Sequence, residues 1–183
     1  ARGARAMTPM RLVFLLVLVA ACGGDDGGEP GPDAAVAAET KVFVVRHAEA
    51  TTDPTDPGLT AAGQARADSL AAMLADDHLA AVYSSQYRRT KDTAMPAAAG
   101  AGLTVQVKMV GASSTAYAAD LAATVMQNPS QHAVLIVGHS NTVPETVKAL
   151  SGTAVPAIAE TEYNRLYIVT LAADGPHLES TTY

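Results

Sequence analysis

Short apolar segments alternate with longer segments of helical composition after residue 40. The apolar segments have the length of strands and cover residues 41–45, 79–83, 103–110 and 132–137. The continuous apolar run at 41–45 is typical of a strand that is covered on both faces of a sheet, whereas apolar and polar residues alternate at 103–110. The segments between them have helix-forming composition and cover residues 60–75, 87–95, 115–127 and 142–150. This alternation predicts an α/β fold, a three-layer α/β/α sandwich around a mostly parallel central sheet.

Individual residues mark where several of these elements start and stop. Thr60 stands where an N-cap is expected, and Pro96 is expected to end the helix before it, because proline lacks the N–H that a helix interior needs. Near the carboxyl end, the strands expected over 165–171 and 178–183 follow one another around a turn at Gly175, with no helix between them. The sheet is therefore expected to end in an antiparallel edge.

The first 39 residues differ in composition from the rest. Residues 12–21 form an apolar run of ten, too short to cross a bilayer core of about 30 Å as a helix, and Cys22 follows it directly. The end of this run resembles a bacterial lipobox, so we expect residues 1–21 to be a lipoprotein-type signal peptide and Cys22 to be lipidated. An ordinary cleaved signal with a chance cysteine is the alternative. Residues 22–39 are rich in Gly, Asp, Pro and Ala, which predicts a lipid-anchored flexible linker.

This organisation predicts an exported protein that is lipid-anchored to the bacterial cell envelope, on its periplasmic or outer face, with residues 40–183 as one domain. All eighteen acidic residues but only nine of the twelve basic ones lie after Cys22, which gives that part of the chain a net charge of −9. Nucleic acid is therefore not expected as a partner. Because Cys22 is the only cysteine, residues 40–183 contain no disulfide and no Cys-rich metal site.

One strand leads into the sequence Gly138-His139-Ser140-Asn141-Thr142, which is similar to the Gly-x-Ser-x-Gly turn of serine hydrolases. Thr142 takes the place of the last glycine of that pattern. Asp174 and His177 follow in the expected order of acid and base, but both belong to one short turn. A serine hydrolase that uses Ser140 is therefore the least favoured interpretation.

Histidines and arginines follow three of the expected strands directly. They are Arg46, His47, Arg88, Arg89 and His139. Because the carboxyl ends of parallel strands meet at one edge of a sheet, we expect these side chains to converge. Arginine forks bind phosphoryl oxygens in pairs, a neutral imidazole can attack phosphorus, and a helix that starts near Thr142 adds N–H donors. The pattern therefore predicts a phosphate pocket.

Four segments in order resemble the histidine phosphatase superfamily, the phosphoglycerate-mutase-like proteins. The sequence VVRHAE at 44–49 resembles its Arg-His-Gly/Ala-Glu signature, and LTAAG at 59–63 its Leu-Thr-x-x-Gly segment. The sequence YSSQYRRTKDTA at 83–94 is similar to its Ser-Ser-x-x-x-Arg-x-x-x-Thr-Ala segment, and VGHSNT at 137–142 to its second-histidine segment. The resemblance covers the chain from residue 41 to about residue 171.

The resemblance implies a catalytic domain over residues 40–183, a phosphatase that hydrolyses a phosphomonoester or a phosphohistidine. His47 would take the phosphoryl group as a phosphohistidine intermediate, while Arg46, Arg89 and His139 would hold its oxygens. The further substrate-binding candidates are Ser140, Asn141 and Arg88. The resemblance implies no metal and no organic cofactor, and the expected partners are a phosphorylated small molecule or phosphoprotein and, through the lipid anchor, the membrane.

The chain departs from the family pattern at two places. Asp53 stands where many members have an asparagine, and residues 110–114, after the third strand, lack the carboxylate that protonates the leaving oxygen in many members. Glu145 and Asp120 are the remaining candidates for the proton donor. Without a donor, leaving groups such as phosphohistidine or aryl phosphates are favoured, and mutase activity is not expected. A non-catalytic phosphate- or anion-binding lipoprotein of the same fold remains the alternative.

Overall fold

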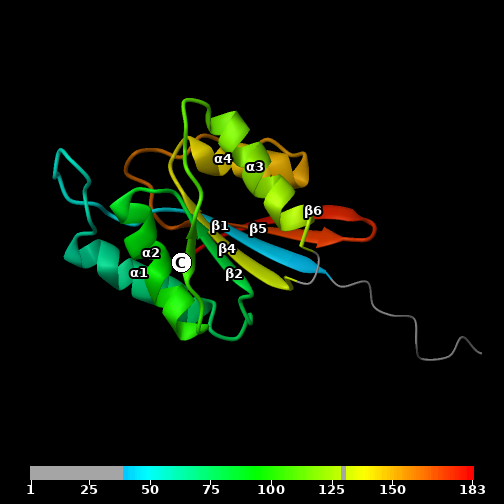
Figure 1. Ribbon diagram of the computed structural model, residues 1–183, viewed down its shortest axis with the longest axis horizontal. Helices are drawn as coiled ribbons and strands as arrows, with labels where there is room; N and C mark the ends of the chain where they lie inside the picture. Colours follow the sequence, from blue (N-terminus) through cyan, green and yellow to red (C-terminus); the bar gives the residue numbers. More distant parts are fainter. Residues whose placement is uncertain (1–38, 129–130) are drawn as a thin grey trace, which may run out of the picture. The chain divides into compact units, whose positions relative to one another are not determined.

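The computed structural model describes residues 39–128 and 131–183, which contain one six-stranded sheet and four helices (Figure 1). The elements in chain order are β1 (Thr40–Arg46), α1 (Ala61–Met73), β2 (Ala81–Ser84), α2 (Arg88–Gly100), β3 (Val105–Val107), α3 (Ser114–Met126), β4 (Ala133–Gly138), α4 (Thr142–Ser151), β5 (Arg165–Ala172) and β6 (Gly175–Thr182). The predicted signal peptide, Cys22 and nearly all of the predicted linker lie outside the described residues. No helix in the described ranges is long and apolar enough to span a membrane.

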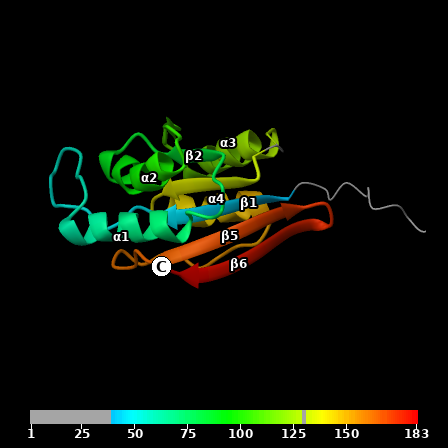
Figure 2. The same cartoon turned by 90° about the horizontal axis from the view of Figure 1, so that it is seen from below.

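The sheet has the strand order β3-β2-β4-β1-β5-β6. The first four strands are parallel to one another, β5 runs antiparallel to β1, and β6 pairs with β5 as a hairpin. The mostly parallel sheet with an antiparallel edge is therefore confirmed. β5 and β6 lie side by side along one border of the sheet in Figure 2.

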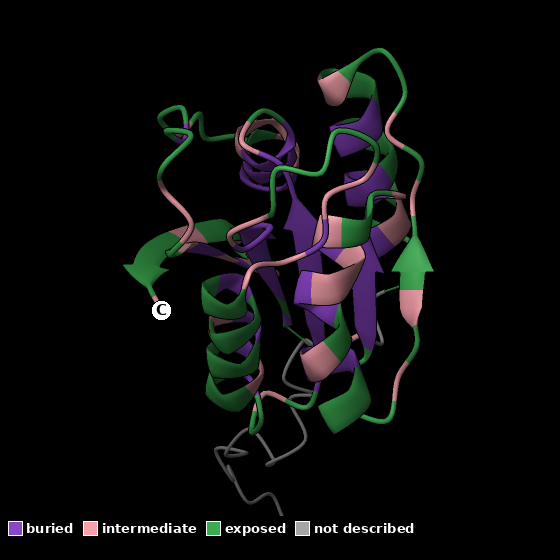
Figure 3. Cartoon of the chain, turned by 90° about the vertical axis from the view of Figure 1, so that its left-hand side faces the viewer, coloured by how far each residue is buried: buried purple, intermediate pink, exposed green. Residues whose placement is uncertain are grey.

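The helices cover the two faces of the sheet in pairs. Successive side chains of a strand point to opposite faces, and β1 shows this clearly. Its Phe43 and Val45 pack in the cluster that holds the buried residues of α1 and α2, whereas Val42 and Val44 pack in the cluster that holds those of α3 and α4. Figure 3 shows buried strands between helices whose outer faces are exposed. The α/β/α sandwich predicted from the alternation of strand and helix segments is confirmed.

Two predicted boundaries are wrong. Helix α2 does not end before Pro96 but continues to Gly100. The residues after the proline explain this, because Ala97 and Ala98 are buried against the sheet and their packing holds the last turn in place despite the missing N–H. Strand β3 spans only Val105–Val107, because it is an edge strand with β2 as its one neighbour.

The strand register brings the ends of several elements together at the carboxyl ends of the parallel strands. Arg46 at the end of β1 pairs with Gly138 at the end of β4, and Ser84 of β2 pairs with Val137. Because β5 is antiparallel to β1, its beginning lies at this same edge, where Leu166 pairs with Val45. The segment between α4 and β5 therefore reaches the edge where the histidines and arginines were predicted to meet.

Candidate functional site

A cavity of about 280 Å³ lies at the carboxyl edge of the parallel strands. It is lined by Arg46, His47, Tyr87, Arg89, Val110, His139, Ser140, Asn141 and Glu160. These residues come from the end of β1, the start of α2, the loop after β3, the turn between β4 and α4, and the segment before β5. Six of the residues predicted for the site are thus brought together.

Arg46 is held in place by the segment that precedes β5. Its guanidinium is buried, and its Nη1 donates to the backbone oxygens of Ala159 (2.7 Å) and Glu162 (3.1 Å). Its Nη2 donates to Oε2 of Glu160 at 2.8 Å, and the guanidinium carbon lies 4.4 Å from the ring centre of Tyr163. Arg46 therefore sits in the wall of the cavity in a fixed orientation.

His47 is buried beside Arg46 with one ring nitrogen engaged. Its Nδ1 lies 2.8 Å from the backbone oxygen of Ala48. Since a carbonyl oxygen can only accept, Nδ1 carries the proton and Nε2 is left with the lone pair. Burial lowers the pKa of His47 from 6.5 to about 4, so the imidazole is neutral near pH 7. A neutral imidazole with an unprotonated Nε2 can act as a nucleophile.

His139 lies across the cavity from His47, with the ring centres 5.4 Å apart. Its Nε2 is 2.8 Å from the hydroxyl of Ser85, and its Nδ1 is 3.3 Å from Nη2 of Arg89. Because a guanidinium can only donate, Nδ1 accepts from Arg89 and Nε2–H donates to Ser85. Burial, and then the charge of Arg89, lower the pKa of His139 to about 3. Both histidines are therefore neutral near pH 7.

Arg89 is positioned by the first turn of α2. Its guanidinium carbon lies 4.8 Å from the ring centre of Tyr87. Among the described residues, no carboxylate lies within ion-pair distance of it. Its charge is thus available to an anion in the cavity, where it would gain a charge-assisted hydrogen bond.

The loop after His47 is tied to two helices. The amide of Ala48 donates to the hydroxyl of Thr93 in α2 at 3.0 Å, which ties the loop to the helix that carries Arg89. Glu49 forms a two-pronged ion pair with Arg66 of α1, with its closest N–O distance at 2.7 Å. The backbone directly after the histidine is therefore braced by two helices from one face of the sheet.

Glu160 and Tyr163 were not found by sequence reasoning. They belong to the segment before β5, which contains no recognisable motif. A topological signal was available, because an antiparallel β5 must begin at the edge where the parallel strands end. The residues just before position 165 were thus bound to lie near the predicted pocket.

Several other predicted residues lie away from the cavity lining. The Arg88 side chain is 63% exposed and pairs with Asp92. Glu145 lies in the first turn of α4, where it accepts a hydrogen bond from Thr115 (3.2 Å), and Asp120 pairs with Lys108. Neither carboxylate lines the cavity.

The residues that a serine hydrolase would need are separated. The Ser140 hydroxyl donates to Oε1 of Glu160 (2.9 Å), and Thr142 accepts from the amide of His139 (2.8 Å). Asp174 and His177 pair with each other near the turn between β5 and β6. That turn lies at the amino ends of the parallel strands, opposite the cavity, since Leu171 pairs with Thr40 at the start of β1.

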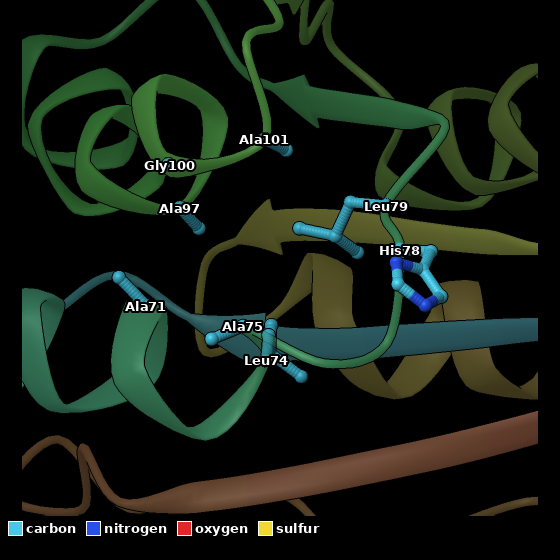
Figure 4. Close-up of a pocket in the computed structure, with 8 residues that line it drawn as sticks. All are labelled: Ala71, Leu74, Ala75, His78, Leu79, Ala97, Gly100 and Ala101. Carbon is cyan, nitrogen blue, oxygen red and sulfur yellow. The ribbon is translucent and has the colours of Figure 1, made fainter.

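A larger cavity of about 400 Å³ lies between α1 and α2 and the segment before β2 (Figure 4). Its lining is mostly alanine and leucine, and His78 is its one titratable side chain. Because this segment leads into the start of β2, the cavity is remote from the edge with the paired histidines. Within the described ranges, no group of three His, Cys, Asp or Glu side chains could hold a metal ion.

The fold and the first cavity define an α/β protein with two neutral histidines and two arginines around a small space suited to a phosphate-sized anion. The family comparison agrees with this description. Residues 42–109 match the model of the histidine phosphatase superfamily (branch 1). No curated protein sequence matches the chain.

Solved structures with the same fold include three phosphatases. A mycobacterial glucosyl-3-phosphoglycerate phosphatase is 14% identical with a TM-score of 0.60, and the match covers 79% of this chain and 98% of that one. The protein histidine phosphatase SixA complexed with tungstate is 21% identical with a TM-score of 0.61, over 78% and 97%. A putative phosphohistidine phosphatase SixA from Agrobacterium tumefaciens is 19% identical with a TM-score of 0.58, over 79% and 98%. At these identities, the likeness shows the fold.

Proposed function

We propose that the protein is a phosphatase that hydrolyses a phosphomonoester or a phosphohistidine through a phosphohistidine on His47. The observation that carries the proposal is the state of His47, a buried neutral imidazole whose Nδ1 is held by the Ala48 carbonyl. The lone pair of Nε2 attacks phosphorus, and the bond from phosphorus to the leaving group breaks. Water then attacks the phosphohistidine, releases inorganic phosphate and restores the neutral imidazole.

The neighbouring side chains supply the electrostatic part of the reaction. Arg46 and Arg89 line the cavity together with the two histidines and offer N–H donors to the oxygens of the phosphoryl group. His139 and the Ser140-Asn141 turn complete the lining of the cavity. Donors fixed in this way stabilise the charge of an in-line transfer and need little reorganisation during the step.

The leaving group has to depart with little help from a protein acid. Glu160 is the carboxylate that lines the cavity, and hydrogen bonds from Ser140 and the charge of Arg46 lower its pKa, so it is ionised at neutral pH. An ionised carboxylate has no proton to give. Phosphohistidine and aryl phosphates are therefore the proposed substrates, and mutase activity is not proposed. Structural likeness to SixA supports this choice.

The test of the proposal is a phosphoenzyme assay with reactive aryl phosphates. The protein should form a phosphoenzyme that is stable to base and labile to acid. His47→Ala should abolish both the phosphoenzyme and turnover, while Ser140→Ala should keep most of the turnover. Loss of activity in Ser140→Ala with retention in His47→Ala would instead support a serine hydrolase. Vanadate binding by the wild type without any turnover would support the non-catalytic anion-binding protein.

The predicted location is part of the same proposal. The apolar run at 12–21 and Cys22 support an exported protein that is lipid-anchored to the cell envelope. Expression of the full chain in a bacterial host should place it in the membrane fraction. Cys22→Ala should move it to the soluble exported fraction, and an unchanged membrane fraction would contradict the lipid anchor.

A further inference from the structure

Glu160 places a fixed negative charge at the mouth of the cavity. Its side chain is 81% exposed, yet both carboxylate oxygens are engaged. Oε1 accepts from the hydroxyl of Ser140 at 2.9 Å, and Oε2 accepts from Nη2 of Arg46 at 2.8 Å. The carboxylate is therefore held in one position, although water reaches most of its surface.

The backbone next to Glu160 fixes the position further. The carbonyl oxygens of Ala159 and Glu162 both accept from Nη1 of Arg46, so three hydrogen bonds tie this segment to the cavity wall. Arg46 itself is buried, whereas the carboxylate it holds faces solvent. A ligand group that projects out of the cavity thus meets the charge of Glu160 before that of Arg46.

We propose that Glu160 is a specificity-determining residue, whose charge favours phosphorylated substrates with a cationic or neutral group beside the phosphate over those with a second anion there. This inference rests on the proposed function, because the same cavity takes the phosphoryl group. Arg46 and Arg89 attract the phosphoryl group in the cavity. Glu160 acts on the part of the substrate that remains at the mouth.

The expected size follows from Coulomb's law. A unit charge several ångströms from a partly exposed carboxylate changes affinity by about threefold to tenfold, with opposite signs for a cation and an anion. The two effects multiply when a cationic and an anionic ligand of the same shape are compared. Such a ratio of dissociation constants cancels the common contribution of the phosphoryl group.

The test uses three aryl phosphonates, which cannot be hydrolysed: phenylphosphonate, 4-carboxyphenylphosphonate and 4-(aminomethyl)phenylphosphonate. Calorimetry at low salt should show that the wild type binds the aminomethyl compound about tenfold or more tightly than the carboxy compound. Glu160→Gln keeps the shape and removes the charge, and it should reduce this ratio at least about threefold. An unchanged ratio in a folded Glu160→Gln variant would overturn the inference.

Glu162→Gln is the matched control. It removes the same charge from the same segment, but the Glu162 carboxylate pairs with Arg165 and does not line the cavity. Its ratio should equal that of the wild type, and an equal reduction in both variants would also overturn the inference.

A second measurement needs no variant. The ratio in the wild type should decrease as salt is raised from about 0.02 M to about 0.5 M, because ions screen exposed charges. A ratio that does not depend on salt would contradict a role for Glu160. If the wild type binds none of the three compounds, both this inference and the proposed function are wrong. If it binds all three equally well, only this inference is wrong.

Discussion

The tautomer of His139 is set by a chain of hydroxyl groups. The Thr90 hydroxyl lies 2.8 Å from the backbone oxygen of Tyr87, so it donates there and accepts from Ser85 at 2.7 Å. The hydroxyl of Ser85 then accepts from Nε2–H of His139, as the contact of Arg89 with Nδ1 also requires. In this neutral tautomer, Nδ1 consequently has no proton to offer to an anion.

Binding of phosphate should therefore raise the pKa of His139. The pKa is about 3 in the empty cavity because of burial and the charge of Arg89. A dianion beside the ring favours the imidazolium, which can donate from both nitrogens. NMR titration of the ring signals should show a pKa at least about two units higher with saturating inorganic phosphate than without it.

The exposed His177 is the internal control for this titration, because it lies near the turn between β5 and β6, away from the cavity. Its titration should not respond to phosphate. An unchanged pKa at His139 with phosphate bound would contradict the role of this ring as a donor to the anion.

At the residue scale, the convergence of residues at strand ends could be predicted from the sequence, whereas their chemical roles stay predictions. Arg46, His47 and His139 line the cavity because the ends of parallel strands must meet. The charge pattern alone does not separate Arg88 from Arg89, since neighbouring helix residues point about 100° apart, and it is the resemblance to the Ser-Ser-x-x-x-Arg segment that selects Arg89. Glu160 was not predicted as a site residue, because its segment has neither a helical nor a strand periodicity.

At the scale of elements, α1 packs so closely against the loop after His47 that a side chain at Gly63 would not fit. A Cβ atom added at Gly63 would lie 2.2 Å from the backbone oxygen of Glu49. The amide of Gly63 donates to the N-cap Thr60, whose own amide donates to that same oxygen of Glu49. The glycine of the Leu-Thr-x-x-Gly segment thus permits the helix start to touch the loop after His47.

Gly63→Ala should therefore destabilise the protein and displace the loop. Because the clash is with backbone, we expect a loss of about 2 kcal/mol or more in the free energy of unfolding, the size typical of overpacked sites. Gly100→Ala, at the end of α2, is the control, because its Cβ would meet nothing within 4 Å. It should be neutral or slightly stabilising, since alanine is the better helix former. Equal effects in urea denaturation would contradict the packing argument.

Helix α2 contains a second element-scale test at Pro96. The sequence rule predicted a helix end there, but the buried alanines that follow extend the helix to Gly100. Pro96→Ala should restore the N–H toward residue 92 and remove the ring clash. We expect the free energy of unfolding to rise by about 1 kcal/mol or more, measured by urea denaturation. An unchanged or lower free energy of unfolding in Pro96→Ala would contradict this expectation and mean that the proline does not destabilise the helix.

The boundaries of α2 and β3 were hard to predict for a common reason. Local rules describe an isolated segment, whereas both boundaries depend on neighbours that are distant in sequence. Ala97 and Ala98 gain from contact with strands of the sheet, and β3 has a partner on one side only. By contrast, β1 and β4 are central and continuously apolar, so burial and local pattern agree and the prediction was close to the observed bounds.

For the whole molecule, the net negative charge opposes the binding of a phosphate anion. The fold compensates locally, because strand ends from β1 and β4 and the start of α2 bring two arginines to one cavity. The same convergence buries two imidazoles in neutral form, which links the chemistry of the cavity to the stability of the fold.

Stability should consequently decrease as the pH falls from 7 to 5. In the unfolded chain, His47 and His139 protonate near their ordinary value of 6.5, whereas in the folded protein their pKa values are about 4 and about 3. Between these values the unfolded chain binds protons that the folded one does not, so unfolding is favoured progressively. Full stability from these groups is thus present above pH 6.5.

Replacing both histidines by glutamine should flatten this dependence. The decrease in melting temperature between pH 7 and pH 5 should be clearly smaller in the His47→Gln, His139→Gln double variant than in the wild type, whatever the variant's stability at pH 7. His177→Gln is the contrasting control, because Asp174 raises the pKa of His177 and its contribution has the opposite sign. Its removal should leave the decrease as steep or make it steeper. If the melting temperatures of the double variant and the wild type fall equally between pH 7 and pH 5, the folded protein does not hold these two histidines unprotonated in this range. That result would contradict the lowered pKa values of His47 and His139.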